Sequence, residues 1–373
     1  MIVRRIEAWQ LARDASFFDA SRMGRSPMPW DVVLLALTSD SGLVGHATAL
    51  GARSGLVTLT YLMDVIAPVV LGRDVTDREA IWQELWNIDR HLAFFPVFLP
   101  GPVDVALWDL AAKAAGLPLY RYLGAYRSEL PVYASSLFKP RASEYAEEAK
   151  QYVSRGIHAY KAHPPGGGVA IDKEVHHCVR DAVGPGVTLM SDPVGEYTLE
   201  EAIAVGRDLE SLGYYWFEEP FRDFELAKYA ELCRSLDIPI AGTETTRGGP
   251  WGVAQTIRFG AVDIVRADVS WKAGITGTLK IAHLAEANGM RCEVHCTTMG
   301  VMDIANLHVS CAIRNCEFFE LLIPEEPFRF PLAGPYPISP KGNIRVSDQP
   351  GLGVEIDWTA VDARCVAHRA KEV

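Results

Sequence analysis

The sequence lacks several patterns that would define its class at once. Its seven cysteines are odd in number, are irregularly spaced and include no CxxC pair, so neither a disulfide framework nor a zinc site is expected. No run of Lys or Arg interrupts the formal net charge of −11. That balance argues against a nucleic-acid-binding surface, and we expect no nucleic-acid partner.

Long apolar runs are missing as well. Val32–Leu37 is among the longest, far below the ~20 residues that a membrane-spanning helix needs. Met1–Arg5 leads directly into alternating polar and apolar residues, without the apolar segment and cleavage site of a signal peptide. We therefore expect a cytoplasmic protein without a membrane partner.

The order of strand-like and helical segments divides the 373 residues into two regions. In residues 1–125 strand-like segments come first and helical periodicity follows, which favours an α+β domain. The expected strands are Ile2–Leu11, Trp30–Leu37 and Leu43–Leu50, and the expected helices are Val57–Val69, Asp77–Arg90 and Val103–Ala115.

In residues 126–335 short strands alternate with amphipathic helices, which indicates βαβ units and a parallel sheet. The expected strands are Pro131–Ala134, His158–His163, Val187–Asp192, Trp216–Glu218, Ile238–Glu244, Ile264–Asp268, Arg291–His295 and Glu317–Leu321. Eight such strands predict a TIM-like barrel. The turn-rich remainder, about 336–373, is expected to return to the first domain.

Polar side chains recur at the ends of these apolar strands. The steps between them range from 22 residues, from His295 to Glu317, to 31 residues, from Lys161 to Asp192. One βα unit occupies about this length, so we expect these side chains on the one rim where barrel enzymes build their active sites. The full set is Lys161, Asp192, Glu218, Glu244, Asp268, His295 and Glu317.

Three of these residues predict a metal site. Asp192, Glu218 and Glu244 come from consecutive strands, with no Cys or His among them. Hard carboxylate oxygens in this number suit Mg²⁺, which also accepts substrate oxygens as ligands.

Nitrogen-bearing groups flank the expected metal site. Lys161 and His163 are two residues apart on a strand, so both point to the same side. Asp268 can orient His295 from the neighbouring strand and raise its basicity. This arrangement suits removal of a proton α to a carboxylate, with the metal and Lys161 holding the enolate-like intermediate.

Four motifs in order resemble the enolase superfamily, and specifically its mandelate racemase-like subgroup. They are Val103–Leu110, Phe217–Pro220, Asp268–Gly277 and Pro350–Asp357. Superfamily sites with Lys or His bases and Mg²⁺ are well known. The subgroup rests on Asp268, since muconate-lactonizing relatives have a lysine base there.

The resemblance implies an α/β protein with a (β/α)7β modified TIM barrel and an N-terminal α+β capping domain. It implies Mg²⁺ as cofactor. It also implies that loops of the cap, Ser16–Trp30 and the segment near Gly45–Gly51, close over the substrate. Glu317 matches the eighth-strand acid that hydrogen-bonds the substrate. Further substrate-binding candidates are Arg247, Arg25 and Glu320. We also expect a homo-oligomer.

The sequence departs from the family pattern at three places. His163 stands where relatives often carry a basic lysine, and the third-strand motif reads Asp192-Pro193-Val194 instead of Asp-x-Asn. Thr243 separates Glu244 from the glycine that usually precedes this ligand.

The leading functional hypothesis is a Mg²⁺-dependent dehydratase of a sugar acid, an aldonate or aldarate. Proton abstraction would give an enediolate, and loss of the β-hydroxyl would give a 2-keto-3-deoxy acid. The alternatives are a racemase or epimerase of a 2-hydroxy acid using the same site, an aldolase using Lys161 as a Schiff-base lysine, and a binding or structural barrel with no turnover.

Overall fold

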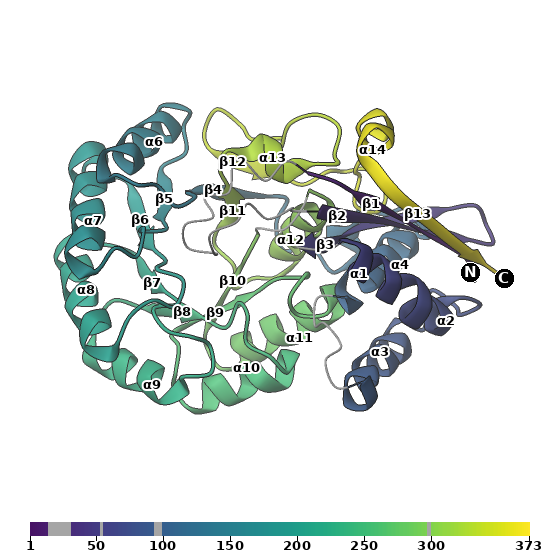
Figure 1. Ribbon diagram of the computed structural model, residues 1–373, viewed down its shortest axis with the longest axis horizontal. Helices are drawn as coiled ribbons and strands as arrows, with labels where there is room; N and C mark the ends of the chain where they lie inside the picture. The colour runs from purple at the N-terminus through teal and green to yellow at the C-terminus, as the bar shows by residue number, and fades with distance from the viewer. Residues whose placement is uncertain (14–30, 53–54, 93–98, 297–299) are drawn as a thin grey trace.

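The computed structural model describes residues 1–13, 31–52, 55–92, 99–296 and 300–373. It shows two parts side by side: a ring of strands and helices from the middle of the chain, and a sheet with helices that uses both chain ends (Figure 1). The two termini lie next to each other on the side away from the ring (Figure 1). No helix in these ranges is long and apolar enough to cross a membrane.

The smaller part, the cap, is a four-stranded antiparallel sheet with helices packed against it. Its strand order is β13-β1-β2-β3, so the last strand of the chain pairs with the first and Arg5 lies opposite Glu372. Its strands are β1 (Val3–Leu11), β2 (Asp31–Ser39), β3 (Val44–Ala52) and β13 (Cys365–Glu372). Its helical segments are α1 (Gly55–Tyr61), η1 (Leu62–Ile66), α2 (Ala67–Val70), α3 (Arg78–Leu92), α4 (Pro100–Ala114), α5 (Leu119–Tyr122) and α14 (Trp358–Arg364).

The larger part is a parallel sheet curled into a barrel. Its ladder runs β10-β9-β8-β7-β6-β5-β4-β11, so β4 pairs in parallel with both β5 and β11. The strands are β4 (Glu129–Ser135), β5 (Ala159–Ala162), β6 (Thr188–Ser191), β7 (Trp216–Glu218), β8 (Ile240–Gly242), β9 (Ile264–Ala267), β10 (Arg291–Val294) and β11 (Phe319–Leu322). A short strand, β12 (Asn343–Arg345), adds antiparallel to β4.

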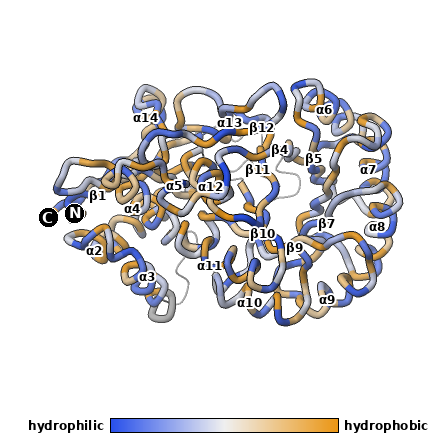
Figure 2. Tube along the Cα trace, turned by 180° about the vertical axis from the view of Figure 1, so that it is seen from behind, coloured by the Kyte–Doolittle hydropathy of each residue, from blue (hydrophilic) through white to orange (hydrophobic). Residues whose placement is uncertain are grey.

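Helices surround the barrel. The first five are amphipathic, and Figure 2 shows hydrophilic and hydrophobic stretches alternating along them, as expected for helices with one face in solvent. The next two are mostly buried, the second of them along almost its whole length. In chain order the helices are α6 (Ala142–Ser154), α7 (Val169–Val183), α8 (Leu199–Ser211), α9 (Leu226–Ser235), α10 (Gly249–Arg258), α11 (Gly274–Ala287), α12 (Val301–Ala312) and the short α13 (Glu325–Arg329).

A side chain bridges the seam where the barrel ladder is open. In the described part of the chain no strand ladder joins β10 to β11. The buried Glu293 of β10 spans the gap, since its carboxylate accepts the N–H of Glu317 at 3.1 Å and that of Phe318 at 3.3 Å. Burial raises the pKa of Glu293 to about 7.

The first family-like motif docks the cap onto the barrel. Asp104 of α4 is buried, and its carboxylate accepts the N–H of Thr276 at 2.9 Å and the Thr276 hydroxyl at 2.6 Å. It thus caps the amino end of the barrel helix α11. The approach requires Gly274, because a Cβ there would lie 2.3 Å from Asp104 Oδ2 and φ is +90°.

A second acid of the same helix fixes the C-terminal motif. Asp109 is buried and accepts hydrogen bonds from Lys113 Nζ at 2.7 Å, from the His46 N–H at 3.0 Å and from the Leu352 N–H at 2.8 Å. One carboxylate therefore joins α4, β3 and the segment around Pro350–Asp357.

The predicted fold class is confirmed: an α/β barrel with a separate α+β domain built around the N-terminal segment. The boundaries after residues 125 and 335 stay predictions. Of the two expected cap segments, Ser16–Trp30 lies outside the described residues. Gly45–Gly51 is part of β3, paired with β2, and therefore is a strand and not a loop.

Candidate active site

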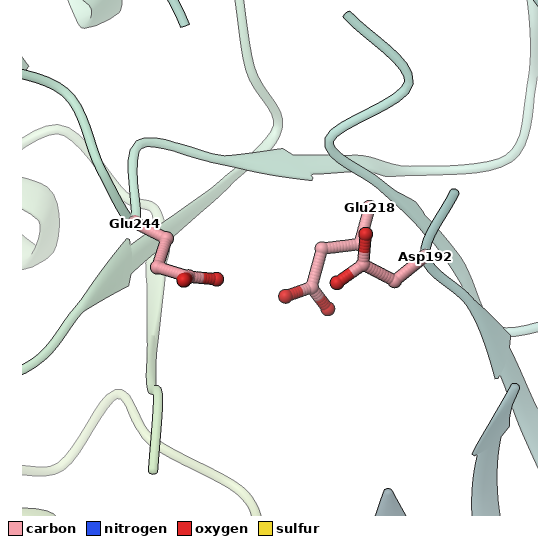
Figure 3. A group of neighbouring side chains, drawn as sticks. All are labelled: Asp192, Glu218 and Glu244. Carbon is pink, nitrogen blue, oxygen red and sulfur yellow. The ribbon is translucent and has the colours of Figure 1, made fainter. Parts of the chain in front are cut away.

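Three carboxylates converge at one end of the barrel. Asp192 follows β6, Glu218 ends β7 and Glu244 follows β8, and one oxygen of each lies within 4.8 Å of the others. Figure 3 shows Glu244 facing Asp192 and Glu218 across a shared space. Asp192 and Glu218 are buried, and Glu244 is partly so. Oxygen donors of this kind, this close together, fit Mg²⁺.

The backbone around these ligands adopts an unusual conformation. Val194, Glu219 and Thr243 have φ values of 57°, 37° and 86°, in the left-handed region that non-glycine residues rarely occupy. Each is within two residues of a carboxylate of the cluster. Strain of this kind collects at functional sites, where the surrounding fold maintains it.

The second glutamate of the Phe217–Pro220 motif supports the third ligand. Glu219 is buried, and its Oε1 accepts the N–H of Glu244 at 2.9 Å. Burial, together with the charge of Glu244, raises the pKa of Glu219 well above its usual range. The sequence interpretation missed this residue, although it stands next to Glu218 in the motif.

Lys161 and His163 lie beside the Asp192 end of the cluster. The buried Lys161 Nζ is 3.0 Å from Glu218 Oε1 and 3.6 Å from Asp192 Oδ2. Burial by itself would lower the pKa of Lys161, but the negative charges of Glu218 and Glu320 raise this pKa above its usual value. A firmly protonated amine does not form a Schiff base readily, which disfavours the aldolase reading.

The ring of His163 is held in one orientation. Its Nδ1 is 2.6 Å from the Ser136 carbonyl oxygen, so Nδ1 carries the proton. Its Nε2 then faces Asp192 Oδ2 at 3.1 Å. Ser136 also accepts the His163 N–H through its hydroxyl at 3.0 Å. Burial by itself would raise the pKa of Asp192, but the neighbouring His163 and Lys161 lower this pKa to about 2.

His295 and Asp268 form a dyad at the Glu244 end. His295 Nδ1 is 2.8 Å from Asp268 Oδ2, and its Nε2 is 3.3 Å from Glu244 Oε1. Burial by itself would lower the pKa of His295, but this pKa is raised to about 9 by the nearby carboxylates of Glu244, Glu320 and Asp268. Asn306 of α12, which the sequence interpretation missed, donates to Asp268 Oδ1 at 3.1 Å and to the His295 carbonyl at 2.9 Å.

The structure does not bring Glu317 to the cluster, and its contact with substrate stays a prediction. Glu317 precedes β11 at the other end of the strand, is partly exposed and contacts Arg291 at 2.8 Å and Tyr215 at 2.6 Å. Glu320, within β11, is the buried acid that reaches the cluster, with Oε1 2.8 Å from Lys161 Nζ. Side chains alternate along a strand, so Glu317 and Glu320, three residues apart, face opposite sides, and only Glu320 points into the barrel.

The two arginine candidates are not brought into the cluster. Arg247 is exposed in the turn that follows Glu244, just before α10. Arg25 lies outside the described residues. Their roles as substrate-binding residues stay predictions.

The arrangement suits proton transfer next to bound negative charge. His163 contacts one end of the carboxylate cluster and His295 the other, so two proton-carrying groups flank the same space. Lys161 adds a positive charge beside Glu218 and Asp192. A substrate carboxylate bound at the cluster would present its α-carbon to these groups.

Two family models match the chain. The model described as enolase C-terminal domain-like matches residues 144–360. The model described as mandelate racemase / muconate lactonizing enzyme, N-terminal domain, matches residues 23–124.

Individual relatives cover most of the chain. An arabinonate dehydratase from Saccharolobus solfataricus is 30% identical over 340 residues, 89% of this chain and 90% of its own length. A D-galactarolactone cycloisomerase from Agrobacterium fabrum is 32% identical over 345 residues, 88% of this chain and 90% of its own. The crystal structure of a D-glucarate dehydratase from Agrobacterium tumefaciens, complexed with magnesium, is 32% identical with a TM-score of 0.87, covering 98% and 99% of the two chains.

Proposed function

The chain belongs to the mandelate racemase / muconate lactonizing enzyme family of the enolase superfamily, and on this premise we propose that it is a Mg²⁺-dependent dehydratase of a sugar acid. The observation that carries the proposal is the buried carboxylate cluster with a histidine at each end. Relatives named as dehydratases of arabinonate, glucarate and galactarate support an aldonate or aldarate as substrate.

Asp192, Glu218 and Glu244 would hold the cation. When bound, Mg²⁺ supplies Lewis-acid stabilisation of negative charge on the substrate's carboxylate oxygens. The donor set fits, because it offers three carboxylates from consecutive strands and no sulfur or nitrogen ligand.

The side chains around the cluster would carry out the proton transfers. His295, oriented by Asp268, would remove the C2 proton or protonate the departing C3 hydroxyl. Lys161 would stabilise the charge on the carboxylate, and His163 would assist or act as the base on the opposite face. The C2–H and C3–O bonds break, water leaves, and the enol product becomes a 2-keto-3-deoxy acid. Glu320 would contact the substrate.

A screen of acid sugars for 2-keto product, with and without EDTA, tests the proposal. We expect turnover that is lost on metal removal and restored by Mg²⁺. In the variants H163N and H295N, net turnover should fall by about 10²–10⁴-fold, the usual contribution of a general acid or base. H283N is the matched control, because His283 is exposed on α11. Full activity in metal-stripped protein would refute the proposal.

Racemisation or epimerisation of a 2-hydroxy acid is the second candidate. It is favoured by the two histidines at opposite ends of the cluster, which could remove a proton from one face and return it to the other. Exchange of the α-proton in D₂O without formation of a keto acid would select this candidate. The variant that loses exchange would identify the base.

A further inference from the structure

Four charged side chains close a ring inside the barrel, and one of them, Glu218, also belongs to the carboxylate cluster. Lys161 Nζ is 3.0 Å from Glu218 Oε1, and Glu218 Oε1 is 2.9 Å from Arg266 Nε. Arg266 Nη2 is 2.5 Å from Glu320 Oε2, and Glu320 Oε1 returns to Lys161 Nζ at 2.8 Å. Positive and negative groups alternate around this ring, so its formal charges cancel.

The ring follows from barrel geometry. Its members come from β5, β7, β9 and β11, and alternate strands contribute the four side chains of one interior layer. Such layers are usually filled by branched apolar residues. Here all four side chains are charged, and each is 1% exposed or less.

Arg266 is the member of this ring with no role in the proposed chemistry. It lies two residues before Asp268, points into the barrel and is fully buried. Its Nη2 also donates to the Tyr133 hydroxyl at 3.1 Å, and its Nη1 donates to the Glu293 carbonyl at 3.3 Å. A guanidinium keeps its charge and can serve two carboxylates at once, whereas a lysine ammonium is a single point of charge.

Both partners of Arg266 belong to the proposed site. Glu218 is a predicted cation ligand, and Glu320 is the acid beside Lys161. The Nε–Glu218 contact is an ion pair without the alignment of a hydrogen bond, so Arg266 acts on this ligand mainly through charge and position. Trp216 Nε1 holds the other Glu218 oxygen at 2.9 Å.

We propose that Arg266 is a positioning residue that fixes Glu218 as a cation ligand and Glu320 as a substrate-facing carboxylate. The proposal rests on the proposed function. Arg266 would touch neither the cation nor the substrate, and would act only by holding Glu218 and Glu320 in position. Groups that orient ligands in this way typically contribute 10- to 100-fold to metal affinity or activity.

The test compares R266K with the wild type, using Mn²⁺ as the probe. R266K keeps the charge but cannot span both carboxylates, so we expect Mn²⁺ to bind about 10- to 100-fold more weakly. With an acid sugar that the wild type converts, the kcat of R266K should fall by a similar factor. Y133F is the matched control, because it removes a partner of Arg266 in the same interior while leaving all four ion pairs; we expect less than a threefold change.

The outcomes separate this inference from the proposed function. If wild-type protein does not bind Mn²⁺, the proposed metal site fails. If wild-type protein binds Mn²⁺ and R266K binds it equally well with unchanged kcat, only the role of Arg266 is refuted. Should R266K not fold, R266Q serves with the same readouts, since its amide can reach one carboxylate but not both.

Discussion

At the scale of single residues, the site depends on how the backbone aims each carboxylate. Thr243 is the clearest case, because a β-branched residue at a φ of 86° is rare. Its hydroxyl donates to the Arg266 carbonyl at 2.7 Å and accepts the Arg266 N–H at 3.2 Å. The side chain thus completes the pairing of β8 with β9 while the backbone turns Glu244 toward the cluster.

The strain at Thr243 predicts an inverted preference between glycine and alanine. Both T243G and T243A lose the two hydroxyl hydrogen bonds, but only T243G relieves the left-handed conformation, which costs roughly 1–2 kcal/mol for an L-residue. We expect T243G to be more stable than T243A by about 1 kcal/mol, measured by urea denaturation.

The same pair of substitutions at Thr188, at the start of β6, is the control. Thr188 is not among the residues with positive φ, so alanine should be the more stable there, as it usually is. A T243A protein as stable as T243G, or more stable, would show that glycine does not relieve strain at this position.

At the scale of elements, the barrel has a seam between β10 and β11, where no strand ladder joins the described strands. Glu293 closes it with a buried carboxylate that accepts backbone N–H groups, in place of a ladder. Burial raises the pKa of this group to about 7 from 4.5, so the folded protein holds the proton more tightly than the unfolded chain. The contribution of Glu293 to the stability of this seam therefore depends on pH.

The sign of this dependence follows from linkage. The contribution of Glu293 is present below pH ~4.5 and is lost as the pH rises through about 7. The shift from 4.5 to about 7 corresponds to about 3.5 kcal/mol, at about 1.4 kcal/mol per pKa unit. In E293Q this titration is absent, so the stability of the variant relative to the wild type should rise between pH 4.5 and 7 and then level off.

Thermal unfolding of both proteins across this pH range gives the measurement. E174Q is the control for the change from Glu to Gln itself, since Glu174 is exposed on α7. A constant difference between E293Q and the wild type would contradict the assignment.

At the scale of the whole molecule, two acids of α4 join segments that are far apart in the sequence, and one of them attaches the cap to the barrel. Asp104 caps α11, and Asp109 joins α4 to β3 and to the C-terminal segment. The motif Val103–Leu110 therefore attaches the cap to the barrel and is not part of the reacting centre. Through it, the cap has a fixed position relative to the barrel.

Removing the Asp104 carboxylate should loosen this attachment. In D104A the Thr276 N–H and hydroxyl lose their acceptor in a buried interface, which costs about 1–3 kcal/mol per unsatisfied group. We expect a lower free energy of unfolding by urea denaturation. D181A, at an exposed position of α7, should stay within about 0.5 kcal/mol of the wild type. A D104A protein as stable as D181A would refute the docking role.

Much of the fold and part of the site could be predicted from local pattern. Strands alternating with amphipathic helices define the barrel, because each βα unit carries its own periodicity. Asp192, Glu218 and Glu244 follow apolar strands directly, so the convergence seen in Figure 3 could be anticipated. The histidine–aspartate dyad follows from the same rule, applied to two neighbouring strands.

The sequence by itself determined the order of elements, the family and the residues at the rim, because these depend on short-range periodicity and spacing. Only the tertiary structure decided that Glu320 and not Glu317 reaches the site, and that Arg266 completes the ring beneath it. Neighbours inside a barrel come from alternate strands: Lys161 and Glu218 are 57 residues apart, and Arg266 and Glu320 are 54 apart. Their contact depends on where each strand starts and which side chains face inward, and a shift of one residue reverses the facing.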